Sequence, residues 1–208
     1  MKDKKINDNM LIIIAAVVLI SLVVGVSYAA FRYSKIGNVE NVITTGAITM
    51  SYTESEKGIN LVDALPMTDV TGKNLNDEGQ IFDFTVAATI KGSMSINYAI
   101  TATIEEDNYL TSNFVKVYLT DVDDKVDSLF GSDAKRVKDL KKADDNNMAG
   151  VPSGEFILKE GIYSKNTVEN YRLRMWVAED YVGAGSGNMP KQTYKLKVNV
   201  YGNAGALQ

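Results

Sequence analysis

Apolar and polar residues alternate with a period of two over most of the chain, and this pattern is the feature that most limits how the chain can fold. In Ile81–Ile90 every second residue is apolar: Phe82, Phe84, Val86, Ala88 and Ile90. Such spacing is typical of a β-strand with one buried face. Because alternation resumes over residues 96–104 after a turn at 91–93, we expect the two segments to pair as an antiparallel hairpin.

Further segments follow the same pattern: residues 42–43, 47–52, 59–61, 114–120, 155–163, 171–177 and 194–201. Six to nine strands separated by turn signals predict an all-β fold, an antiparallel β-sandwich, and favour a jelly roll. Residues 65–69 are interpreted as a turn between strands.

Residues 121–150 depart from this pattern because they are rich in Asp and Lys and poor in large apolar side chains. The spacing of Val137 and Leu140 predicts a short helix within an excursion from the sandwich. Four acidic residues at its start resemble calcium ligands: Asp121, Asp123, Asp124 and Asp127. The loop lacks a glycine at the sixth position and a glutamate at the twelfth, so a solvated acidic loop is favoured and no metal is assigned.

The chain contains no cysteine and no histidine. Nucleophile–histidine pairs and ordinary zinc sites are therefore excluded, no catalytic residue or cofactor is assigned, and stability has to come from burial and backbone pairing rather than disulfides. The net charge is −4 at pH 7. Since lysines and arginines are interleaved with acids throughout, nucleic acid is not expected as a partner.

The N-terminus has the layout of an export signal. Lys2, Lys4 and Lys5 precede an apolar run over residues 10–26, and Ser27 and Ala29 are small residues at the −3 and −1 positions of a cleavage site before Ala30. We expect residues 1–29 to be removed, residues 30–45 to form an N-terminal segment and residues 46–208 to form the sandwich domain. The alternative is an uncleaved membrane anchor, because residues 10–26 nearly suffice to span a bilayer. Both interpretations place the domain outside the membrane.

Arg172, Arg174 and Trp176 share one face of an expected strand. They suggest a carbohydrate or peptide platform, but guanidinium groups beside an aromatic ring are common on sheet surfaces, so a structural role is favoured.

Several short motifs resemble TasA and camelysin, matrix-fibre and surface proteins of Gram-positive bacteria. They are the Tyr-Ala-Ala-Phe junction at 28–31, Thr-Gly-Ala-Ile-Thr-Met at 45–50, Ile-Asn-Leu at 59–61 and Tyr-Arg-Leu-Arg-Met-Trp at 171–176. The resemblance implies processing by the signal peptidase SipW and secretion to the cell surface or biofilm matrix.

The resemblance also implies assembly with further copies of the chain, in which the segment freed by cleavage is laid into a neighbour's sheet. The candidate donor residues are Phe31, Tyr33, Ile36, Val39, Val42 and Ile43. The alternatives for this segment are that it is the first strand of its own domain or a flexible tether. The alternatives for the chain are a membrane-anchored monomeric adhesin and a camelysin-like metallopeptidase. The last is disfavoured because no His-Glu-x-x-His motif is present.

Overall fold

The computed structural model describes residues 33–36, 41–45, 48–54, 58–76, 79–92, 94–106, 109–122, 133–147, 149–182 and 193–206. The expected signal segment, with Ser27, Ala29 and Ala30, lies outside these residues. So do Phe31 and Val39 of the candidate donor set.

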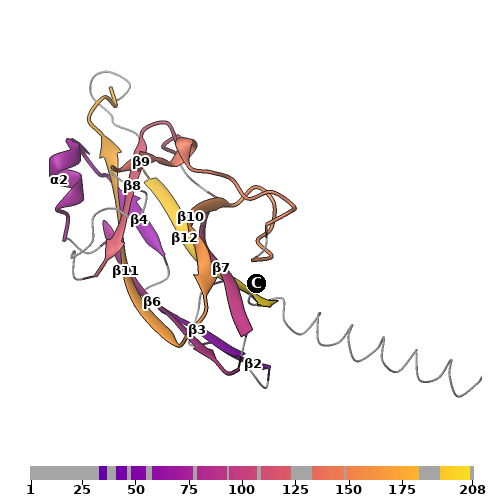
Figure 1. The fold of residues 1–208 in the computed structure, drawn as a ribbon. Helices are drawn as coiled ribbons and strands as arrows, with labels where there is room; N and C mark the ends of the chain where they lie inside the picture. Colours follow the sequence, from indigo (N-terminus) through magenta and orange to yellow (C-terminus); the bar gives the residue numbers. More distant parts are fainter. Residues whose placement is uncertain are drawn as a thin grey trace, which may run out of the picture.

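The described strands form two sheets (Figure 1). The five-stranded sheet contains β1 (Tyr33–Ile36), β4 (Ile59–Val62), β12 (Thr193–Ala206), β7 (Met94–Ile104) and β10 (Phe156–Tyr163). The seven-stranded sheet contains β2 (Asn41–Thr45), β3 (Ile48–Glu54), β6 (Ile81–Ile90), β5 (Pro66–Met67), β11 (Thr167–Ala178), β8 (Val115–Asp121) and β9 (Lys135–Arg136). All pairs are antiparallel except β5 with β11. The all-β, antiparallel part of the prediction is confirmed.

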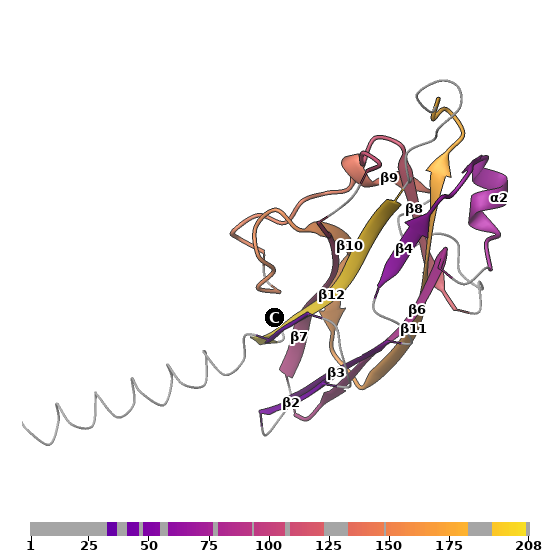
Figure 2. The same ribbon diagram turned by 180° about the vertical axis from the view of Figure 1, so that it is seen from behind.

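The two sheets lie in separate layers, as the view from behind also shows (Figure 2). Burial alternates along β6, where the apolar positions of the sequence pattern are the buried ones up to Ala88. These residues join inward-facing side chains of β7, β11 and β12 in one apolar core. This arrangement agrees with a β-sandwich.

The expected hairpin between residues 81–90 and 96–104 is wrong. β6 pairs with β3 and β11, whereas β7 pairs with β12 and β10 in the other sheet. The turn after Ile90 therefore carries the chain from one layer to the other. A tight turn reverses the chain direction but does not decide whether the strands lie side by side or face each other across a core.

The expected helix around Val137 and Leu140 is a single 3-10 turn, η1 (Val137–Asp139), directly after β9. Both apolar residues are buried, as their spacing suggested. Residues 65–69, expected to be a turn, instead contain β5 and the first residue of a helix, α2 (Asp69–Lys73).

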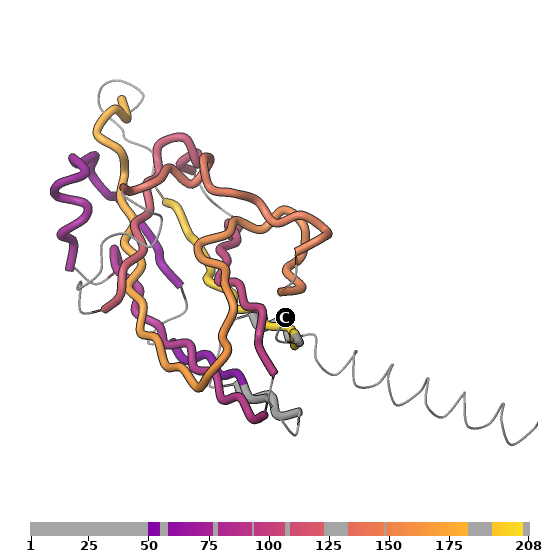
Figure 3. Tube along the Cα trace, viewed as in Figure 1, coloured from indigo at the N-terminus to yellow at the C-terminus, as the bar shows by residue number. Residues whose placement is uncertain are grey.

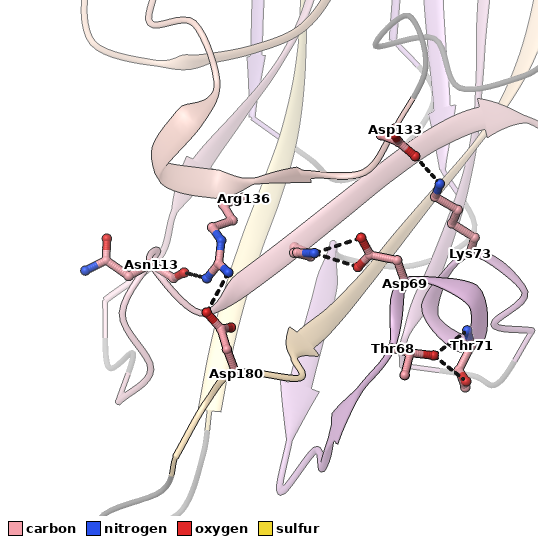
Figure 4. A network of polar contacts seen from close by, with 9 residues as sticks. Thr68, Asp69, Thr71, Lys73, Asn113, Asp133, Arg136 and Asp180 are labelled. Atoms are coloured by element: carbon pink, nitrogen blue, oxygen red, sulfur yellow. Dashed lines mark hydrogen bonds and ion pairs between the residues drawn. The ribbon is translucent and has the colours of Figure 1, made fainter.

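The helix α2 is placed against the seven-stranded sheet by capping, ion pairing and a glycine contact. Thr68 accepts a hydrogen bond from the backbone N–H of Thr71 at 3.3 Å, and Asp69 accepts from Lys116 of β8 at 2.7 and 2.8 Å. Figure 4 shows this cap and the neighbouring Lys73–Asp133 pair. A Cβ on Gly72 would lie 2.3 Å from two ring atoms of Trp176, so only glycine allows this approach.

Replacing Gly72 by alanine tests the contact between α2 and Trp176. Overpacking costs about 1–3 kcal/mol, and two ring atoms at 2.3 Å make this cost exceed the gain of about 1 kcal/mol that alanine brings to a helix. We expect a lower free energy of unfolding in urea. Val70→Ala is the matched control, because Val70 lies on the same helix and is 74% exposed; equal unfolding midpoints for the two variants would contradict the contact.

Candidate functional site

One edge of β12 carries two short strands placed end to end. β4 pairs with the start of β12, from Thr193 to Leu196, and β1 pairs with residues 199–202. The opposite edge of β12 is paired with β7 up to Ala206. In the part of the chain that the structure describes, nothing pairs with residues 203–206 on the edge that holds β1.

The candidate donor residues are divided between the two sheets. Tyr33 and Ile36 belong to β1, whereas Val42 and Ile43 belong to β2, which pairs with β3. The segment is therefore not one continuous strand on one sheet. Its described parts pair with the chain's own sheets.

The register of β1 further separates its two candidate donor residues. Tyr33 lies opposite Gly202, on the core face of β12, while Ile36 lies opposite Asn199, on the outer face. Residues directly opposite in an antiparallel pair share a face. Apolar character alone could not reveal this division, because the face of each residue depends on the register.

The inward face of β12 carries small residues towards its end. A Cβ on Gly202 would lie 2.5 Å from the Met50 sulfur of β3, so Met50 occupies the place of a side chain there. Ala204 follows on the same face and is only partly buried.

Two other described sheet edges, those at β10 and β9, carry features that oppose strand addition. β10 has a register shift between Ile157 and Lys159, and Lys159 lies opposite the buried Ile100, on the core side. β9 is two residues long and consists of Lys135 and Arg136. Bulges, inward charges and short charged edges are the devices by which proteins block edge pairing.

A polar cluster holds Lys159 on the core side. Tyr163 and Tyr171 both donate hydrogen bonds to one carboxylate oxygen of Glu169, Tyr163 at 2.7 Å. The Lys159 ammonium donates to the Tyr171 hydroxyl at 3.0 Å and lies 4.8 Å from the centre of its ring. Tyr98 stacks on Tyr163 with ring centres 3.9 Å apart. The cluster thus joins β10 to β11 across the two sheets.

The pKa shifts of the three hydrogen-bonded groups favour stable hydrogen bonds within the cluster. Burial, and then hydrogen bonding to Glu169, raises the pKa of Tyr163 and of Tyr171, so both stay neutral donors. Burial alone would raise the pKa of Glu169, but the hydrogen bonds from the two tyrosines together with the Lys159 ammonium outweigh it and hold that pKa below its usual value. A carboxylate with a lowered pKa is a weak proton acceptor and tyrosines with raised pKa values are weak proton donors, so the cluster is poorly matched to general acid–base catalysis near neutral pH.

The candidate platform residues are held by the fold. Arg172 donates to both carboxylate oxygens of Asp83 at 2.8 Å. Arg174 is 1% exposed and donates to the Leu75 carbonyl at 2.8 Å. Trp176 is fully buried beneath α2. These contacts support the structural interpretation of the pattern.

The excursion covers the outer face of the five-stranded sheet beside β10 (Figure 3). Glu155 accepts hydrogen bonds from Thr101, from Asn199 at 3.2 Å and from Tyr201 at 2.6 Å, and so fastens the end of the excursion to β7 and β12. A cleft of about 370 Å³ remains between residues 141–149 and the two strands below, lined mainly by asparagine, small apolar and charged residues.

Nowhere among the described residues do three or more acidic side chains gather closely enough to hold a metal ion. Asp121 ends β8 opposite Tyr171, and the other three candidate calcium ligands lie outside the described residues. The described residues also contain no helix long and apolar enough to cross a membrane.

Comparison with protein-family models and with curated proteins gives no match to this chain. The likeness to TasA and camelysin therefore rests on the short motifs of the sequence and stays a prediction.

Replacing Glu169 by glutamine tests the polar cluster. A carboxylate whose pKa is lowered by folding stabilises the native state above its unfolded pKa, and this stability is lost as the pH falls through the folded pKa. We expect Glu169→Gln to lower the free energy of unfolding at pH 7 by about 1 kcal/mol, the scale of one net hydrogen bond. The difference from the unmodified chain should shrink in urea titrations between pH 5 and about pH 3.

The matched control is Glu160→Gln on the outer face of β10, whose ion pair with Lys141 is solvent-exposed. Exposed pairs contribute about 0–1 kcal/mol. A Glu169→Gln deficit that stays constant with pH would show that the carboxylate charge does not matter.

Proposed function

We propose that this chain is an exported structural protein of the cell surface or extracellular matrix: a TasA-like fibre subunit with a jelly-roll domain that assembles by β-strand addition after signal removal. The observation that supports the proposal best is the position of β1. The first described strand after the expected cut lies at a sheet edge, on four paired residues of β12 and with no second neighbour among the described strands.

Exchange of such an edge strand between two subunits changes the free energy little. In a fibre, the β1 strand of one subunit pairs with residues 199–202 of the next, so the contacts of the free subunit are reproduced between subunits. Backbone hydrogen bonds supply the register. The bulged β10 and the charged β9 are poor alternative acceptors, which favours the β12 edge as the place of addition.

Signal removal acts as the switch for this exchange. Tyr33 is the fourth residue after Ala29, and four extended residues span at most about 14 Å. While residues 10–26 remain in the membrane, β1 is therefore confined to the membrane surface. Cleavage before Ala30 frees the strand to reach the edge of another subunit.

The second candidate is a membrane-anchored monomeric surface adhesin. It is favoured by the pairing of β1 and β2 with strands of their own chain, as a monomer requires. The cleft beside the excursion offers it a contact surface. We propose no enzymatic activity for either candidate, because the sequence holds no histidine or cysteine.

Replacing Tyr33 by aspartate tests strand exchange. Its position lies opposite Gly202 on the core face, so a charge there should be desolvated whenever β1 pairs with β12. We expect the exported Tyr33→Asp protein to form no fibres in electron micrographs while its core still unfolds cooperatively in urea. Tyr33→Phe, which keeps the ring, should form fibres.

The N-terminal residue of the exported protein separates the two candidates. Ala30 at the start of a species far larger than the ~20 kDa expected of a processed subunit supports the fibre, whereas intact Met1 in the membrane fraction supports the anchored adhesin.

Fibre growth by Tyr33→Asp at the normal rate would overturn strand exchange.

A further inference from the structure

Two aromatic and two cationic residues form a square on the outer face of the seven-stranded sheet, where β11 runs beside β8. Arg174 lies opposite Tyr118, and Trp176 lies opposite Lys116. Opposite residues of an antiparallel pair share a face, as do residues two apart in one strand. Each aromatic residue therefore has a cation beside it in its own strand and another in the neighbouring strand. We call these four residues the square.

Residues 68–75, which contain α2 and which we call the strap, cover the square. Both cations of the square donate hydrogen bonds to the strap. The Lys116 ammonium donates to the two carboxylate oxygens of Asp69 at 2.7 and 2.8 Å. The guanidinium of Arg174, which is 1% exposed, donates to the Leu75 carbonyl at 2.8 Å.

Both aromatic residues of the square also contact the strap. The Lys73 ammonium lies 5.4 Å from the centre of the Tyr118 ring, within the range of a cation–π contact. Gly72 lies against the Trp176 ring so closely that a Cβ would be 2.3 Å from two ring atoms. Each residue of the square is thus contacted by a different residue of the strap.

The helix α2 directs its charged residues to the sheet and its only large apolar residue to solvent. Asp69 and Lys73 both contact the square (Figure 4), whereas Val70 is 74% exposed. A surface helix that serves only as a cover packs an apolar stripe on the sheet and leaves its charges in water. α2 is therefore held as a polar peptide ligand would be held.

The strap leaves one group of the square unused. The ring N–H of Trp176 is buried and has no hydrogen-bond partner among the residues that the structure describes. Most buried donors in native proteins are paired, and leaving one unpaired costs free energy. A ligand that brings an acceptor to this N–H gains a hydrogen bond that the strap does not make.

We propose that the square is a peptide-binding site and that the strap occupies it in place of a segment of a partner protein. The segment has the chemistry of the strap: a carboxylate for Lys116, a glycine three residues later for the Trp176 ring, and a backbone carbonyl for Arg174. The site opens when the strap leaves. The proposal goes beyond fibre assembly and does not depend on it.

The only tryptophan of the chain reports on this site, because its emission moves to longer wavelength when water reaches the ring. Gly72→Val should displace the strap, since the added side chain overlaps the ring. We expect the exported variant to show red-shifted emission and faster acrylamide quenching while the sandwich still unfolds cooperatively in urea. Val70→Ala, at an exposed position of the strap, is the matched control and should keep the unmodified spectrum.

A synthetic peptide of residues 66–76 is the probe for binding. A tethered segment competes at an effective concentration on the order of mM, so we expect the peptide to bind the Gly72→Val chain at least about tenfold more tightly than the unmodified chain. Binding should return the emission towards shorter wavelength. Peptides that carry Gly72→Ala or Asp69→Asn are the matched controls and should bind much more weakly.

Equal binding of the three peptides to the Gly72→Val chain, or binding of none, overturns the site. Unchanged emission in that variant overturns the position of the strap. If Gly72→Val does not unfold cooperatively, Asp69→Asn in the full chain replaces it, because this change removes the pair with Lys116 without adding volume.

Two further readouts separate this site from other forms of assembly. A heavier species in sedimentation when the Gly72→Val chain is mixed with the unmodified chain, without peptide, would assign the site to the strap of a second copy and overturn a separate partner. Peptide binding and emission do not require fibres, so loss of fibres in Tyr33→Asp and loss of peptide binding here are independent results.

Discussion

The pairing of β12 with β7 is the interaction on which the rest of the five-stranded sheet depends. It runs without a register shift from Leu196 to Ala206. Because β7 also pairs with β10, and β12 with both β1 and β4, every other strand of this sheet is attached to one member of the pair. Inward residues in the middle of the two strands, among them Ile100 and Val198, are fully buried or nearly so. The central pair is regular, so the irregular features of this sheet lie at its edge strands.

The sequence could predict the faces of the strands but not their partners. Alternation in Ile81–Ile90 correctly gave the buried side of β6, because that pattern is set by burial. The supposed hairpin with β7 failed because burial looks the same for strands that are neighbours and for strands that face each other. The sequence did not predict α2 for another reason, because five residues are too few to show a helical period. The only local signal for this helix was Thr68, a residue type favoured at the N-cap.

The candidate sites show the same division. Arg172, Arg174 and Trp176 were correctly placed on one face of β11, yet nothing in their spacing shows that Gly72 of α2 closes over the tryptophan. The Tyr163–Glu169–Lys159 cluster carried no motif, since its members come together only when β10 and β11 cross between the layers. Long-range contacts of this kind are set by topology, which one sequence does not contain.

The difference between the two edges of the five-stranded sheet bears on the direction of the proposed assembly. At β10, a bulge and an inward lysine held by Glu169 and Tyr171 make the addition of a strand costly. At β12, the edge beyond Gly202 is straight, uncharged and lined by small residues. In the proposed fibre, β10 is therefore the less favourable edge of this sheet for strand addition. If each subunit offers one strand and accepts one, as proposed, addition is head-to-tail and extends in a line.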